Sequence, residues 1–309
     1  MAKPIQKIKN NLVYWFIRFV IFIFNVLPRS IGLFIGSILA YLMYLIFKKE
    51  KIKSNKNLQT AFGDTLSETE RQVIIKQMFF NIVWNFIDII RIPRYYKSQL
   101  RPLIDVEGLE HFKKVYNRGK GVISVTGHIG NFELLAAFSA GEGFKSAAIG
   151  REVYDKRLDK LLVNNRGKMG LVNIDTNDSP RKILKLLKDG YVLGVLMDTD
   201  SYRVRSEMIP VFGTPSNTPV GQSIIGLKTG AGFVPTTCIR TGKRYKVIFK
   251  PEVTINRTDD FDADVYNITK KCTEVWEEIV SEYKDQWIWM HNRWATTQED
   301  KDRWAKGIL

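Results

Sequence analysis

The residues best suited to chemistry lie in one segment, Gly119–Phe138, which reads GKGVISVTGHIGNFELLAAF. A run of strand-forming residues, Val122–Thr126, precedes His128, and Glu133 falls in the first turn of the helix expected next. In open α/β sheets, ligands bind at the carboxyl ends of strands, where His128 would lie. We expect Gly130 to let the loop fold His128 over Glu133. The carboxylate would then orient the imidazole, and the other ring nitrogen could take a proton from an alcohol.

The helix behind this loop adds a second chemical feature. Its first backbone N–H groups have no partner within the helix and could stabilise a developing oxyanion. A structural interpretation stays open, in which His128 caps the helix and Glu133 complements its dipole. The spacing of the two residues does not choose between these interpretations.

Two further carboxylates, Asp198 and Asp200, follow the apolar run Tyr191–Met197. A strand over that run would place both at a strand carboxyl end, where binding residues gather. Either one could hold Arg151 or bind sugar hydroxyls, and the alternative is that they cap the next turn.

Neither a metal site nor a disulfide is expected. The histidines His111, His128 and His291 are scattered, with no metal-ligand spacing. Cys238 and Cys272 are far apart, which predicts two reduced core residues. No GxSxG motif is present and neither cysteine is near His128 in the sequence, so a covalent enzyme intermediate on serine or cysteine is not expected.

Short apolar runs alternate with helical patterns from about residue 104, which predicts crossover units and a mostly parallel sheet flanked by helices. The Thr241-Gly242-Lys243 turn predicts a hairpin between the last two strands. A helix over 68–90, ended by Pro93, precedes the sheet, and a long helix over about 264–283 follows it. The expected strands are Gly121–Thr126, Lys145–Ile149, Leu171–Ile174, Tyr191–Met197, Phe233–Ile239 and Tyr245–Phe249. The expected helices between them are Glu133–Ala140, Asp155–Met169, Pro180–Lys188 and Pro219–Lys228.

The amino terminus predicts membrane-anchor helices. Leu12–Leu27 is apolar apart from Arg18, and Ile31–Phe47 carries no charge. Lysines follow at once from Lys48, which by the positive-inside rule places the downstream chain on the cytoplasmic side. We expect an anchor over 1–50 and a catalytic domain over 51–309, with one or two spans left open. A signal peptide or a pair of buried core helices is the alternative interpretation.

The net charge of the 309-residue chain, +15, favours anionic partners such as lipid headgroups, phosphorylated glycolipid or an acidic carrier protein. Nucleic acid also fits the charge, but a nucleic-acid module would cluster its basic residues with exposed aromatics. Here the basic residues are spread along the chain, which argues against nucleic acid.

The segment GHIGNFE resembles the active-site block of the lysophospholipid acyltransferase superfamily. Glutamate at position 133 and Asn131 before it resemble the branch that acylates lipid A precursors, of the lauroyl or myristoyl type. Further segments match that branch in order: Asn57-Leu58 with Ala61-Phe62, Gly150–Gly170, Gly194–Asp200, Val211–Gly221, Lys228–Pro235 and Gln286–Trp294.

This resemblance implies a glycerolipid acyltransferase-like fold and acyl transfer from an acyl carrier protein thioester to a hydroxyl of a glucosamine-based lipid. It implies no cofactor, a place at the cytoplasmic face of the inner membrane, and His128 as general base with Glu133 as its orienting partner. Arg151 resembles the family arginine that binds phosphate or the oxyanion. Arg166 is a candidate for the same substrate-binding or oxyanion site, although a structural ion pair is favoured over a catalytic contact.

The sequence departs from the family pattern on the acceptor side. Thr199 replaces an amide residue between Asp198 and Asp200, and Ser201–Glu207 is basic rather than glycine-rich. Another glycolipid or a lysophospholipid therefore remains an alternative acceptor. A non-catalytic membrane scaffold is a more distant alternative, which intact His128 and Glu133 argue against.

Overall fold

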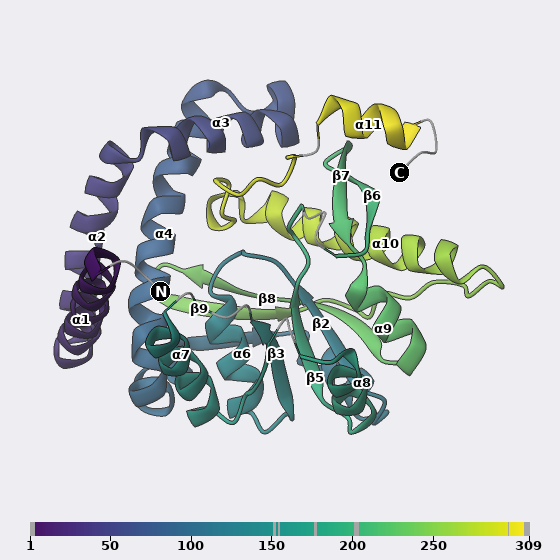
Figure 1. Ribbon diagram of the computed structural model, residues 1–309, viewed down its shortest axis with the longest axis horizontal. Helices are drawn as coiled ribbons and strands as arrows, with labels where there is room; N and C mark the ends of the chain where they lie inside the picture. The colour runs from purple at the N-terminus through teal and green to yellow at the C-terminus, as the bar shows by residue number, and fades with distance from the viewer. Residues whose placement is uncertain are drawn as a thin grey trace.

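A seven-stranded, mostly parallel β-sheet forms the centre of the protein (Figure 1). The computed structural model describes residues 4–150, 153, 155–175, 178–200, 204–295 and 297–305. The strand order is β1-β9-β8-β2-β5-β3-β4, in which β8, β2, β5, β3 and β4 run parallel and β9 runs antiparallel to β8. The strands are β1 (Ile104–Glu107), β2 (Val122–Thr126), β3 (Ser146–Gly150), β4 (Val172–Asp175), β5 (Val192–Leu196), β8 (Gly232–Thr241) and β9 (Arg244–Phe249).

Helices cover both faces of the sheet, because parallel strands are apolar on both sides. Helices α4, α5 and α6 share an apolar core with one face, where α7 also lies, and α8, α9 and α10 pack on the other. The helices are α1 (Pro4–Val26), α2 (Arg29–Ile46), α3 (Lys48–Phe62), α4 (Glu68–Tyr95), α5 (Leu109–Tyr116), α6 (Phe132–Gly141), α7 (Lys156–Lys168), α8 (Pro180–Lys188), α9 (Gly221–Thr229), α10 (Phe261–Glu282) and α11 (Gln298–Ala305).

The predicted alternation of strands and helices is confirmed, and the predicted hairpin of β8 and β9 is present. Strand β1, helix α5 and a separate hairpin of β6 (Ser206–Val211) with β7 (Thr214–Pro219) were not predicted. The prediction that Pro93 ends the long helix is wrong. Helix α4 continues to Tyr95 and is followed by a π-helical turn, Tyr96–Leu100.

Helices α1 and α2 lie beside α4 at one end of the sheet (Figure 1). They carry most of the exposed large apolar side chains of the described residues. Two helical stretches, Arg29–Ile46 and Glu68–Leu103, are long and apolar enough to cross a membrane, although half of the apolar window in the second is buried in the protein. One side of α2 packs so closely on α4 that a Cβ on Gly36 would lie 2.4 Å from the Cδ1 of Ile87.

Both ends of α2 are joined to the rest of the protein. Arg29 at its start forms an ion pair of 2.8 Å with Asp88 of α4. Near its end, the rings of Tyr44 and Phe79 meet edge-on with centroids 6.1 Å apart. The expected division into an anchor, 1–50, and a catalytic domain, 51–309, falls inside α3 and stays a prediction.

Candidate active site

His128 and Asp198 extend from the carboxyl ends of two neighbouring parallel strands, β2 and β5. Thr126 of β2 is in register with Leu196 of β5, so the residues two positions beyond them meet at the sheet edge. The Nδ1 of His128 lies 2.8 Å from Oδ1 of Asp198, and the backbone N–H of His128 donates to Oδ2 at 2.6 Å. A third donor, the indole N–H of Trp287, reaches Oδ2 at 2.7 Å. Three donors thus fix a carboxylate that is completely buried.

Glycines flank the histidine because the backbone is tightly enclosed there. A Cβ on Gly127 would lie 2.4 Å from Nε1 of Trp276 and 2.8 Å from Oδ2 of Asp198, so a side chain would displace the carboxylate. Gly130 has a φ of +59°, which L-residues rarely adopt, and a Cβ there would lie 2.1 Å from the carbonyl oxygen of Cys238. Gly127 therefore allows the pair to form, and Gly130 allows the loop after His128 to pass close to β8.

The ion pair sets the protonation of both partners. Burial disfavours the imidazolium, but the charge of Asp198 and its hydrogen bond outweigh burial and raise the pKa of His128 above 6.5. Burial opposes ionisation of Asp198, yet His128 and the other donors lower the pKa of this carboxyl to about 2. A carboxylate on Nδ1 keeps the proton of the neutral ring on that nitrogen, which leaves Nε2 as the proton acceptor. The His128 side chain remains 21% exposed, so a substrate can reach the ring.

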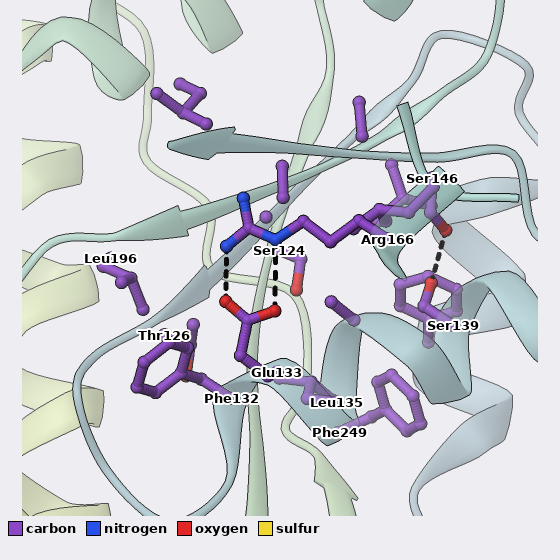
Figure 2. A pocket seen from close by; sticks show the side chains of 18 residues that line it. Ser124, Thr126, Phe132, Glu133, Leu135, Ser139, Ser146, Arg166, Leu196 and Phe249 are labelled. Carbon is purple, nitrogen blue, oxygen red and sulfur yellow. Dashed lines mark hydrogen bonds and ion pairs between the residues drawn. The ribbon is translucent and has the colours of Figure 1, made fainter. Parts of the chain in front are cut away.

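The expectation that Glu133 orients His128 is corrected by the structure, which joins Glu133 to Arg166 (Figure 2). The two carboxylate oxygens accept from Nη2 and from Nε of Arg166, the latter at 3.1 Å. Glu133 lies in the first turn of α6 and reaches over the sheet face towards α7, while Asp198 already occupies Nδ1 of the histidine. The ion pair expected of Arg166 is present, and its guanidinium also donates to Asn173 at 2.7 Å.

Three further residues were predicted to belong to the site: Asn131, Asp200 and Arg151. Asn131 is buried and caps α6, since its Oδ1 accepts from the N–H of Leu134 at 3.0 Å. Asp200 accepts from the backbone N–H of Ala295 at 3.0 Å, which ties the strand end to the carboxyl-terminal segment. Arg151 lies outside the described residues.

The carboxyl-terminal segment Gln286–Trp294 packs against the His128–Asp198 pair. Two of its residues, Trp287 and His291, contact the pair, which was not predicted. The ring of His291 lies 4.5 Å from that of His128, and burial together with this neighbour lowers the pKa of His291. Asn57 of α3 donates at 2.7 Å to the carbonyl oxygens of both Trp289 and His291. Two segments that match the family in sequence, more than 200 residues apart, therefore hold each other at the site.

Two tryptophans of this segment, Trp287 and Trp289, are fully buried. Trp287 also has a polar role, because its indole N–H binds Asp198. The single signal for that role in the sequence is its place in a segment that resembles a family signature.

An apolar cavity opens beside Glu133 and Arg166, between α6, α7 and the sheet (Figure 2). It holds about 630 Å³ of space with its open mouth included. Residues of β2, β5 and β3 form one wall, and many are small: Ser124, Thr126, Gly194, Ser146 and Ala148. At the end away from Glu133, the hydroxyls of Ser139 and Ser146 meet at 2.8 Å.

Unused hydrogen-bond donors lie at the mouth of this cavity. The Thr126 hydroxyl lines it and is buried without a partner among the described residues. The backbone N–H groups of Phe132 and Glu133, in the first turn of α6, also have no acceptor in the described part of the chain. Within the same ranges, no cluster of three or more His, Cys, Asp or Glu side chains could hold a metal ion.

A parallel sheet with a histidine–carboxylate pair at the carboxyl ends of its strands and an apolar cavity on one face is an arrangement typical of an α/β enzyme whose ligand has an apolar part. The chain belongs to the bacterial lipid A biosynthesis acyltransferase family, whose sequence model matches residues 3–296. Members of this family are acyltransferases, so the protein is an enzyme that needs an acyl donor and a lipid acceptor.

Curated relatives agree with this assignment. The chain is 24% identical over 289 residues to the lipid A biosynthesis palmitoleoyltransferase of Escherichia coli K12, covering 91% of this chain and 90% of the relative. It is 25% identical over 261 residues to the lipid A biosynthesis lauroyltransferase of the same organism, covering 82% of each. It is also 19% identical over 222 residues to the phosphatidylinositol mannoside acyltransferase of Mycobacterium tuberculosis H37Rv, covering 70% of this chain and 68% of the relative.

Proposed function

We propose that this enzyme transfers a fatty acyl chain from an acyl carrier protein thioester to a hydroxyl of a lipid A precursor, with His128 as general base. One observation carries the proposal: a fully buried carboxylate holds the imidazole, and the centroid of the imidazole ring lies 5.4 Å from that of Phe132, which lines the apolar cavity. The cavity would take the acyl chain, so that the thioester carbonyl lies near His128.

The chemical step follows from the tautomer. Nε2 of His128 takes the proton of the acceptor hydroxyl as the oxygen attacks the thioester carbonyl, and Asp198 stabilises the imidazolium that forms. The tetrahedral intermediate then collapses, the carbon–sulfur bond breaks, and the imidazolium returns the proton to the leaving thiolate. The acyl group passes directly to the acceptor, so both substrates are bound together.

Charge on the carbonyl oxygen requires donors that are already in place. We assign this role to the Thr126 hydroxyl and to the free N–H groups of Phe132 and Glu133, which lie at the cavity mouth. Glu133 remains part of the proposed site, but its role is to hold Arg166 rather than to orient His128. It holds Arg166 beside the cavity, where the guanidinium can meet the thioester or an acceptor phosphate.

The partners follow from charge and apolar surface. A net charge of +15 suits an acidic carrier protein and a phosphorylated glycolipid acceptor, and nucleic acid is not among the proposed partners. The exposed apolar faces of α1 and α2 suit membrane lipids. We place the enzyme at the inner membrane with its catalytic domain on the cytoplasmic face. The proposed chemistry uses no metal and no cofactor besides the acyl carrier protein thioester.

The test is mass spectrometry of purified full-length enzyme with acyl carrier protein thioesters and a set of acceptors. The set contains a lipid A precursor, a mannosylated phosphoinositide and a lysophospholipid. We expect acylation of the lipid A precursor, near-complete loss in His128→Ala, and full activity in the control His111→Ala, whose ring is exposed on α5. Acylation of another acceptor in its place would overturn the proposed substrate, and activity of His128→Ala at the normal rate would overturn the mechanism.

A further inference from the structure

A second cavity lies between α2, α4 and the turn that joins β8 to β9. Its walls include two cationic side chains, Arg240 and Lys243, and two hydroxyl side chains of α2, Ser30 and Ser37. Trp84 of α4 also lines it and donates its indole N–H to Ser37 at 3.1 Å. The space amounts to about 720 Å³ with the open mouth included, which leaves room for a small polar group.

Positive charge is in excess in the buried cluster beside this cavity. Asp88 is fully buried and pairs with two guanidinium groups, Arg29 at 2.8 Å and Arg240 at 2.7 Å. A third arginine, Arg91, is also buried, and in the described part of the chain it donates to backbone carbonyls and to the amide oxygen of Gln99. Among the described residues of this cluster, the carboxylate of Asp88 contacts two guanidinium groups, and the third, that of Arg91, has no carboxylate partner. Because buried charge without a counter-charge is costly, the cluster favours an added anion.

Donors remain available where that anion would bind. Arg240 is 5% exposed, and its Nη1 is buried without a partner among the described residues, whereas Nε and Nη2 are engaged. Lys243 is exposed in the turn and has no ion pair within the described ranges. Ser30 lies in the first turn of α2, whose N-cap, Pro28, makes no side-chain hydrogen bond to the free N–H groups.

We infer that this cavity binds the phosphate group of an anionic phospholipid. Arg240, Lys243 and Ser30 hold the phosphate, and the acyl chains follow the apolar outer side of α2, where Phe34 and Ile38 are 66% and 51% exposed. Basic pockets beside membrane helices bind anionic headgroups by the same combination of charge and apolar contact. Since Arg240 belongs to β8, the bound lipid would link the membrane to the catalytic sheet. The inference rests on the proposed membrane location and not on acyl transfer.

The test measures flotation of purified full-length protein with vesicles of phosphatidylcholine alone and of phosphatidylcholine mixed with phosphatidylglycerol, without any acyl donor. Ser30→Glu and Lys243→Glu place a carboxylate at exposed positions of the cavity, where both variants should fold. Lys185→Glu on α8 makes the same charge change as Lys243→Glu, and a larger one than Ser30→Glu, at an exposed site on the opposite face of the sheet. We expect each cavity variant to weaken binding to the phosphatidylglycerol vesicles about ten-fold, and the control to weaken it little.

Equal weakening by all three variants would show diffuse surface attraction and overturn the inference, as would unchanged binding. A further arm replaces phosphatidylglycerol with a phosphorylated lipid A precursor. An effect of the cavity variants confined to that arm would assign the cavity to the acceptor and overturn the phospholipid. Because no acyl donor is present, failure of the proposed acyl transfer would leave this result unaffected.

Discussion

Replacing Asp198 with asparagine tests the proposed base directly. In the wild type, Oδ2 of Asp198 accepts two N–H groups, from the His128 backbone at 2.6 Å and from Trp287 at 2.7 Å, while Oδ1 accepts from Nδ1 of His128 at 2.8 Å. The single oxygen of asparagine would stay with the two donors. Its NH₂ group would then face Nδ1 of His128 and force the ring proton onto Nε2, the nitrogen that must accept a proton.

The expected loss in kcat is roughly 10²–10⁴-fold, the range for removing general base catalysis. The pH dependence should change as well. Wild-type activity should rise with pH as His128 loses its proton, with a midpoint above 6.5 because Asp198 raises the pKa of His128. In Asp198→Asn the charge is gone and burial remains, so the pKa of His128 should fall and any residual activity should reach its midpoint at lower pH.

The assay follows acyl transfer from the acyl carrier protein thioester across the pH range. The matched control is Asp105→Asn, which removes an exposed carboxylate on β1 that pairs with Arg244. It should leave both the rate and the midpoint unchanged. A normal rate and an unchanged midpoint in Asp198→Asn would refute the assignment of Asp198 and return the orienting role to another group.

Three further predictions concern the cavity and its mouth. Glu133→Ala leaves the guanidinium of Arg166, whose side chain is 13% exposed, without its carboxylate, so the free energy of unfolding should fall by about 2 kcal/mol. The double variant Glu133→Leu, Arg166→Leu removes both charges, so thermal unfolding should show that this stability is recovered while activity stays low. A single variant as stable as the wild type would contradict this. Thr126→Val should have the same unfolding temperature as the wild type, since the hydroxyl has no partner among the described residues, but its kcat should be lower by roughly ten-fold or more. An unchanged kcat would show that Thr126 is not one of the oxyanion donors. Gly194→Val adds a side chain to the cavity wall, so competition between donors of different length should shift towards shorter chains; an unshifted preference would mean that the acyl chain lies elsewhere.

Local patterns in the sequence were sufficient for most of the fold. Continuous apolar runs bounded by glycine predict β2 and β5, because a parallel strand is buried on both faces. The hairpin of β6 and β7 escaped prediction because Thr214–Pro219 is rich in proline, threonine and serine and has no apolar alternation. Its stability comes from tertiary contacts, such as the donation from the buried guanidinium of Arg293 to Ser216 at 2.8 Å.

The sequence by itself determined where His128 lies, at the end of a buried strand, and that the amino terminus is apolar enough for a membrane. Tertiary structure decided the partner of His128. Asp198 is 70 residues away, and it reaches the imidazole because β5 lies between β2 and β3, an order that sequence proximity does not predict. Glu133 is close to His128 in the chain, but α6 aims its carboxylate at Arg166 on α7. The distance between side chains depends on how strands and helices are arranged, and that arrangement is a property of the whole core.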